Sequence, residues 1–269
     1  MSDVTEQRLA TAPLEVVGRF TDASNATLLA RLTDRDDRPL AALADALGRA
    51  PGIDDLPAAD LVVYKPRDGE RPLWDFPAGT LHRREVAAAA VDAAMGARLV
   101  PATLLRDDAP FGPGSVQRFV PHDPEQHYFT LRDAALDGSD TALRDRLALL
   151  AAFDVVVDNA DRKGGHVLVE TGAGSVADGL RAVDHGVTFN VEPKLRTVVW
   201  DLANRPLDAD VVAALDRLLV ALEGTLGARL RTLLSDAEAA VTLERARALR
   251  TGGVLPEPVG PHPFPWPLL

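Results

Sequence analysis

Residues Val155 to Leu168 read VVVDNADRKGGHVL, and the interpretation of the whole chain depends on this stretch. An apolar run gives way to a cluster of charged residues and glycines and then returns to an apolar run. Aspartate, asparagine and glycine are ordinary turn residues, so a surface turn is the simplest interpretation. The alternative is an active-site loop between two buried elements, with Asp161 and His166 as its polar ends. The rest of the sequence has to decide between the two.

The composition is that of a folded, acidic protein. The 269 residues are 46% hydrophobic and 26% charged, with a formal net charge of -11 and no cysteine. A chain of this length can bury a sizeable core, as one large domain or two smaller lobes. The negative charge argues against nucleic acid as a partner. Because no apolar segment has signal-peptide or membrane-spanning length, we expect a cytoplasmic protein without integral membrane contact.

Lysine is rare in this chain. Of 29 basic residues only Lys65, Lys163 and Lys194 are lysines, and all the others are arginines. Lysine is a compact, flexible point charge, whereas arginine is a planar fork, so a lysine marks a place where that difference can matter. Chance is a sufficient explanation for any single one of the three.

The first half of the chain is patterned mainly for strands. Strands are predicted over residues 14–20, 25–32, 61–66, 99–105 and 115–120, the first two forming a hairpin through the turn TDAS. A short helix is expected near residues 40–49. An alanine-rich helix follows, with Thr80 as its N-cap and Gly96 at its C-terminal end.

The second half is patterned mainly for helices. Apolar periodicity predicts a long buried helix over residues 141–157, which leads directly into the opening loop. The remaining predictions are a small hairpin from residues 167–169 and 180–183, two or three helices within residues 208–250, and an extended, proline-rich tail.

Four polar residues form an ordered set along these elements. Lys65 ends an interior strand, where an unpaired ammonium is costly, and Glu85 on the buried side of the alanine-rich helix would satisfy it. A surface lysine and an unrelated glutamate are the alternative. Asp161 lies in the opening loop, and Asp184 ends a strand in VDHG, where an aspartate alone is more often a turn former.

Together the four suit phosphoryl transfer from a metal-bound nucleotide. That reaction needs a cation on the phosphates, ligands for the metal and a carboxylate for the acceptor hydroxyl. The order and spacing match those of kinases. They predict an α+β, bilobal, protein-kinase-like fold with a β-rich N-lobe and a helical C-lobe.

At these residues the chain resembles the atypical kinases related to phosphatidylinositol 3-/4-kinases and to the HipA-type bacterial protein kinases. NADRKGGH, residues 159–166, resembles their Asn-x-Asp-Arg-x-x-x-Asn catalytic loop. AVDHGVTFN and the later VVWDL resemble the Asp-x-Gly-x-x-Phe and tryptophan segments of type II phosphatidylinositol 4-kinases. VVYKP and REVAAAAVD fit the nucleotide lysine strand and the glutamate-bearing helix. The resemblance covers roughly residues 14–250 in organisation, with strong motif matches only in these short segments.

The resemblance implies a role for each matching residue. Lys65 would hold the α/β-phosphates of ATP and Glu85 would orient it. Asp161 would position the acceptor hydroxyl and take its proton late, with Lys163 near the γ-phosphate, and Asp184 would bind the bridging metal, Mg²⁺ or Mn²⁺. Further nucleotide contacts are expected at Ser24 and Asn25, in a hairpin turn that lacks the usual glycines, and at the adenine hinge Gln117, Phe119 and Val120.

His166 departs from the family pattern, which has a metal-binding asparagine at this position. Imidazole binds Mn²⁺ or Zn²⁺ better than Mg²⁺, and it must be neutral to do so. One hypothesis is that His166 is a replacement ligand that gives Mn²⁺-favoured activity. The other is that metal binding is degraded and the fold survives as a nucleotide-binding pseudokinase.

We therefore predict an ATP- and divalent-metal-dependent phosphotransferase acting on a hydroxyl of a protein Ser/Thr, a small molecule or an inositol lipid. One alternative is a non-catalytic regulatory module that binds a protein partner through its C-terminal helices or tail. Another is AMP transfer on the same fold. The predicted organisation is an N-terminal arm (1–13), a kinase-like domain (14–250, with an N-lobe 14–120 and a C-lobe 121–250) and a proline-rich tail (251–269).

Overall fold

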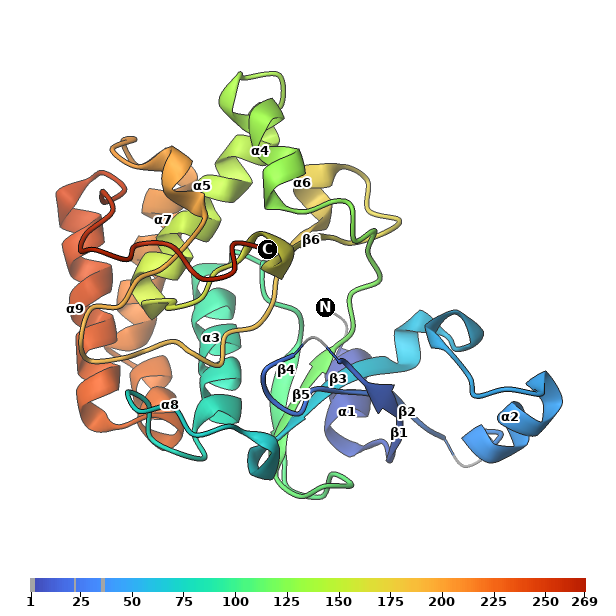
Figure 1. The fold of residues 1–269 in the computed structure, drawn as a ribbon. Coiled ribbons are helices and arrows are strands. Elements are labelled where there is room, and N and C mark those ends of the chain that lie inside the picture. Colours follow the sequence, from blue (N-terminus) through green and yellow to red (C-terminus); the bar gives the residue numbers. More distant parts are fainter. Residues whose placement is uncertain (1–2, 22, 35–36) are drawn as a thin grey trace. The chain divides into compact units, whose positions relative to one another are not determined.

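The structure, a computed structural model, describes residues 3–21, 23–34 and 37–269 and divides into two compact units (Figure 1). One contains residues 1–86 and 101–121 and is built on a β-sheet; we call it the sheet unit. The other, the helical unit, contains residues 87–100 and 122–269. The predicted α+β class, with a β-rich N-terminal part and a helical C-terminal part, is confirmed.

The sheet unit carries a five-stranded antiparallel sheet within the described residues. Its strand order is β1 (Leu14–Arg19), β2 (Leu28–Leu32), β3 (Leu61–Pro66), β5 (Gly114–Arg118) and β4 (Thr103–Arg106). β3 is central, which accounts for its nearly continuous apolar sequence. The predicted strands 25–32 and 99–105 began too early. The Ala26 amide bonds to the Gly69 carbonyl outside the sheet, and the Leu99 amide bonds to the Asp92 carboxylate.

The residues before the sheet form a helix, α1 (Asp3–Thr11), which the sequence predicted only as an arm. Arg106 on β4 is 4% exposed and donates to the Leu9 and Ala12 carbonyls, each at 3.0 Å. Carbonyls at a helix C-terminus lack partners within the helix, so this guanidinium satisfies them. Leu9 and Ala12 thereby join the buried cluster of the sheet, with Ala30, Tyr64 and Val116.

The two helices predicted in the first half are present. α2 spans Leu40–Leu47, and α3 spans Leu81–Met95 and ends at Gly96, whose φ of +68° suits glycine. Thr80 does precede the helix as predicted, and its carbonyl accepts from the Arg84 amide at 3.2 Å, but its side chain is not the cap. The Thr80 hydroxyl donates to a loop carbonyl, and the Glu70 carboxylate accepts from the first two helical amides at 3.1 and 2.9 Å. A carboxylate from a preceding loop therefore caps α3, a contact that spacing along the helix does not reveal.

The helical unit is packed around the predicted buried helix, α5 (Thr141–Val157), which contacts α4, α7 and α9. The other helices are α4 (Tyr128–Leu136), α6 (Val176–Gly179), α7 (Ala209–Leu222), α8 (Thr225–Leu233) and α9 (Asp236–Gly252). α7, α8 and α9 confirm the helices expected within residues 208–250. The small hairpin is β6 (Val167–Val169) with β7 (Leu180–Ala182). No helix among the described residues is long and apolar enough to cross a membrane.

Candidate active site

Lys65 and Glu85 form an ion pair inside the sheet unit. Lys65 lies on β3 opposite Ser115 of β5, and its ammonium donates to the Glu85 carboxylate on α3. The Glu85 side chain is 3% exposed and that of Lys65 20%. Removing one partner of a buried ion pair typically costs about 3–5 kcal/mol, so this contact ties the first half of α3 to β3. The pair expected from the sequence is therefore present.

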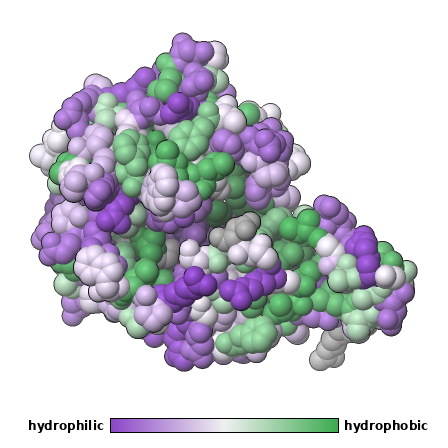
Figure 2. Space-filling model, viewed as in Figure 1, coloured by the Kyte–Doolittle hydropathy of each residue, from purple (hydrophilic) through white to green (hydrophobic). Residues whose placement is uncertain are grey.

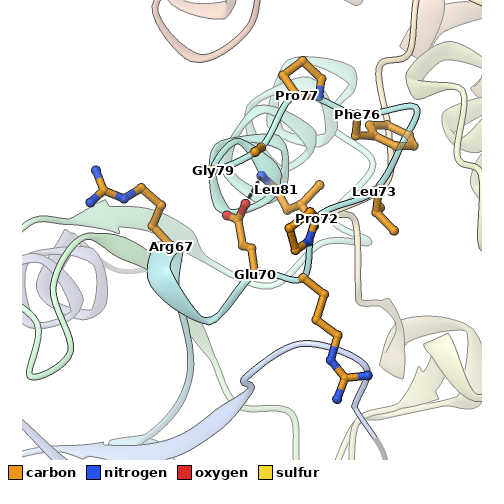
Figure 3. Close-up of a pocket in the computed structure, with 10 residues that line it drawn as sticks. Arg67, Glu70, Pro72, Leu73, Phe76, Pro77, Gly79 and Leu81 are labelled. Carbon is orange, nitrogen blue, oxygen red and sulfur yellow. Dashed lines mark hydrogen bonds between the residues drawn. The ribbon is translucent and has the colours of Figure 1, made fainter.

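The loop between β3 and α3 forms a pocket and sets the start of the helix that carries Glu85 (Figure 3). In Figure 3 the Glu70 side chain points at the first turn of α3, whereas Arg67 points away from the pocket. Glu70 also contacts Nδ1 of His82 at 2.6 Å. Burial by itself would raise the pKa of Glu70, but hydrogen bonds from His82 and the helix amides lower it below the ordinary value. The charged cap therefore persists at neutral pH.

The predicted phosphate-binding turn is tied to this same loop. The Asn25 side-chain oxygen accepts from the Arg71 amide at 2.8 Å, and Ser24 is exposed. Asp22, in the same turn, lies outside the described residues. Asn25 thus has a structural partner, and a phosphate contact by Ser24 or Asn25 stays a prediction.

The predicted adenine hinge begins inside the sheet. Gln117 pairs with Val63 of β3 and Thr103 of β4, and its side chain donates to the Thr103 hydroxyl at 2.8 Å. Beyond the strand, the Phe119 amide bonds to the Leu61 carbonyl, and Val120 is 3% exposed. Adenine binding by these three residues stays a prediction.

In the helical unit, the opening loop holds Asp161 and Lys163 as an ion pair with Oδ2 and Nζ 3.1 Å apart. The Asp161 side chain is 32% exposed, and its amide donates to the Asn159 side chain. Burial raises the pKa of the Asp161 carboxyl; Lys163 opposes this rise, and the nearby Asp184 carboxylate adds to it. A carboxylate with a raised pKa accepts a proton more readily, which suits a general base.

A buried network underneath holds this loop in place. Arg162 and Asp154 of α5 are both fully buried, and the guanidinium donates to both carboxylate oxygens at 3.0–3.2 Å. Asp154 also accepts from the Asn159 amide group and the Thr197 hydroxyl. Arg162 lies 2.8 Å from Nε2 of His185, which must accept because a guanidinium only donates. His185 is therefore a support of the loop.

The sequence reasoning missed Asp154. A signal existed, because a charged residue inside the apolar run AAFDVVV of a buried helix is almost never buried without a partner. The identity of that partner needed the fold. The loop motif contains Arg162, but the motif alone does not give its buried partner.

Asp184 and His166 come together at the end of the β6–β7 hairpin. Nε2 of His166 lies 3.7 Å from Oδ2 of Asp184, and their side chains are 16% and 51% exposed. Asp184 has a φ of +59°, a left-handed conformation that aspartate tolerates better than most residues. Asp161, Lys163, Asp184 and His166 thus gather in the helical unit, whereas Lys65 and Glu85 belong to the sheet unit.

The segment that follows Asp184 is fastened by residues that the sequence did not indicate. Asp158, at the C-terminal end of α5, accepts from the Lys194 amide with both oxygens at 3.1 Å. Arg245 of α9 lies 3.2 Å from Asp158 and also donates to the Asn190 carbonyl. Burial raises the pKa of Asp158 even though Arg245 opposes it. Residues 190–194 are therefore tied to both α5 and α9.

No family model matches the chain. The Mycobacterium tuberculosis (strain ATCC 25618 / H37Rv) protein named Protein Rv2133c is 36% identical over 285 residues, covering 96% of this chain and 93% of the relative. This chain belongs to the Rv2133c family. The name states no activity, so membership in the Rv2133c family does not by itself assign a reaction.

Solved structures with a similar fold include two kinases. The Golgi casein kinase with Mn/ADP bound has a TM-score of 0.51 and 14% identity, over 93% of this chain and 74% of that one. The Helicobacter pylori proinflammatory kinase CtkA has a TM-score of 0.50 and 11% identity, over 92% and 94%. At such identities the likeness establishes the fold alone, and it gives this member of the Rv2133c family an atypical-kinase-like fold.

Proposed function

We propose that this protein transfers the terminal phosphoryl group of ATP to a hydroxyl acceptor. The observation that carries the proposal is the ion pair between Lys65 and Glu85. Protein kinases use a strand lysine held by a helix glutamate to position the nucleotide phosphates. The kinase-like fold supports the same reaction class. A closer relationship to phosphatidylinositol or HipA-type kinases rests on the sequence motifs alone.

In this proposal Asp161 positions the acceptor hydroxyl and accepts its proton as the new oxygen–phosphorus bond forms. Its raised pKa favours that transfer. Lys163, 3.1 Å from Asp161, offsets negative charge on the transferred group. The nucleoside diphosphate leaves as its bond to the γ-phosphorus breaks. The buried Asp154–Arg162 pair keeps Asp161 oriented between turnovers.

Asp184 and His166 fit a divalent ion that the nucleotide helps to hold. Their 3.7 Å separation allows one oxygen and one nitrogen ligand on a single ion. Asp184 and His166 would hold the ion, and within the described residues no group of three or more His, Asp or Glu side chains is arranged for a metal. The ion would supply positive charge that offsets the negative charge of the phosphates. We expect Mn²⁺ to be preferred, because of the imidazole ligand.

The acceptor classes remain a protein Ser/Thr, a small molecule and an inositol lipid. The net charge of -11 disfavours docking on an anionic lipid surface. A second candidate function, a nucleotide-binding regulatory module, is favoured by one observation: His166 beside Asp184, where the family pattern has asparagine. Transfer of AMP is compatible with the same groups.

The test is ATP binding and turnover with Mg²⁺ or Mn²⁺ in the wild type and in Asp161→Asn, His166→Asn and Asp210→Asn. Asp210 is exposed in the first turn of α7 and serves as the matched control. We expect Asp161→Asn to lower kcat by about 10²-fold or more with ATP affinity retained, and Asp210→Asn to change neither. His166→Asn should shift the metal preference towards Mg²⁺.

The same experiment distinguishes phosphoryl transfer from the two alternative functions. The mass of the modified product separates phosphoryl transfer from AMP transfer. Metal-dependent binding without turnover on any acceptor would favour the regulatory module. Absence of nucleotide binding under all conditions would refute the proposal.

A further inference from the structure

The last residues of the chain, 253–269, here called the tail, run back across the helical unit towards the loop that contains Asp161 (Figure 1). The tail is anchored first at Leu255, which is 3% exposed. The Leu255 amide donates to the Arg205 carbonyl, and its carbonyl accepts from the Asn204 amide. The Asn204 side chain also donates to Glu257. This anchoring directs the following residues across the surface of the unit.

The second half of the tail is held through its backbone carbonyls. The Pro263 carbonyl accepts from the Thr197 amide at 3.2 Å and from Nε1 of Trp200 at 2.8 Å. The Leu268 carbonyl accepts from the Gly164 amide at 2.8 Å. These donors lie on the opening loop and on the segment after Asp184, the two segments that border the proposed acceptor site.

Gly164 is enclosed between the tail and α4. A Cβ at this position would lie 2.6 Å from the Phe129 ring and 3.3 Å from Cδ1 of Leu269. Three residues of chain span at most about 11 Å, so Gly164 lies within that distance of Asp161. The tail therefore contacts the loop three residues from the proposed general base.

The chemistry of the tail makes it an occupant that cannot react. From Gly252 to Leu269 there is no Ser, Thr or Tyr, and six residues are proline. Without a side-chain hydroxyl the tail offers no acceptor for the proposed transfer to a hydroxyl. Proline favours an extended backbone, so less conformational entropy is lost when the tail docks. A proline residue also keeps its carbonyl as a hydrogen-bond acceptor, although it has no N–H donor. Any extended polypeptide offers the same carbonyls.

We propose that residues 263–269 occupy the acceptor side of the site as an internal competitor, and that the natural acceptor is an extended polypeptide segment that displaces them. This inference rests on the proposed phosphotransferase function. The donors that the tail uses, the Gly164 and Thr197 amides and the Trp200 indole, would then bind the acceptor backbone. Figure 2 shows hydrophobic side chains at this surface, and Phe264 and Leu269 of the tail are 49% and 59% exposed.

The test compares the wild type with Pro265→Asp and Pro261→Asp. Pro265 is buried in the tail contact, so a charge there should release the tail, whereas Pro261 is exposed and controls for the same change in composition. Amide hydrogen exchange at Gly164 verifies the release. Leu269→Asp, which puts a charge on the tail side chain next to Gly164 and keeps every donor of the loop, is a second release variant should Pro265→Asp fold poorly.

The readouts are ATP turnover and phosphorylation of a degenerate library of serine and threonine peptides. We expect Pro265→Asp to raise the rate of peptide phosphorylation about tenfold. This is the increase for a tail that is docked in about nine wild-type molecules of ten, because only the remaining tenth can bind the peptide. Pro261→Asp should match the wild type. Equal peptide rates in all three proteins, or ATP turnover without peptide phosphorylation in the released variant, would overturn the inference alone. Absence of any transfer, to peptide or water, would refute the proposed function and this inference with it.

Discussion

The buried carboxyl of Asp92 should make the stability of the helical unit depend on pH. Asp92 lies on α3, is 4% exposed, and accepts from the Leu99 amide at 2.9 Å. Burial raises its pKa from 3.8 to about 6, against the opposing effects of backbone hydrogen bonds and of Arg146 and Arg181. The folded state therefore binds the Asp92 proton more tightly than the unfolded state does.

The sign and size of the effect follow from this difference in proton affinity. Stabilisation by protonated Asp92 is complete below pH 3.8 and is lost as the pH rises through about 6. The gap between the two pKa values corresponds to about 3 kcal/mol in full. Of this, about 1 kcal/mol should appear between pH 7 and pH 5.

The assay is urea denaturation of the wild type and of Asp92→Asn, followed by far-ultraviolet circular dichroism at several pH values. The asparagine keeps an acceptor for the Leu99 amide but does not titrate. Between pH 7 and pH 5 the free energy of unfolding of the wild type should rise by about 1 kcal/mol relative to that of the variant. The pKa values of Asp158 and Asp161 are also raised, but their contribution to the pH dependence is the same in both proteins. The same pH dependence in both proteins would refute the assignment to Asp92.

Two further predictions concern the loop. Asp154→Ala leaves the fully buried Arg162 without its counter-charge. It should lower the free energy of unfolding, measured by urea denaturation, by about 3–5 kcal/mol. A loss below about 1 kcal/mol would show that water or another group replaces the carboxylate. Gly164→Ala adds a Cβ 2.6 Å from the Phe129 ring, and this collision should lower the free energy of unfolding by about 1–3 kcal/mol and speed hydrogen exchange at the residue 164 amide. The control is Gly172→Ala, which has open space around it but a φ of +82°. It should lower the free energy of unfolding by only about 1 kcal/mol and leave exchange at residue 164 unchanged. Unaltered exchange in Gly164→Ala would contradict the packing described for the tail.

Several features followed from the sequence because they depend on local pattern. A central strand is apolar along its length, and a helix over an apolar core repeats with its own period, so β3 and α5 were predictable with their ends. The pairing of Lys65 with Glu85 was also predictable, since a charge on an interior strand needs a partner and the following helix offered one. The aspartates of the two loop motifs were selected by their order along the chain and their resemblance to kinase motifs, and their catalytic roles stay predictions.

Other features depend on residues distant in the sequence, which only tertiary structure brings together. The Glu70 carboxylate caps α3 from a preceding loop, and Arg245 of α9 reaches Asp158 across 87 residues of chain. No periodicity encodes such contacts, because each depends on how the intervening elements pack. The tail is the clearest case. Its prolines indicated an extended segment, but its place against Gly164 is set by hydrogen bonds to a loop about a hundred residues earlier.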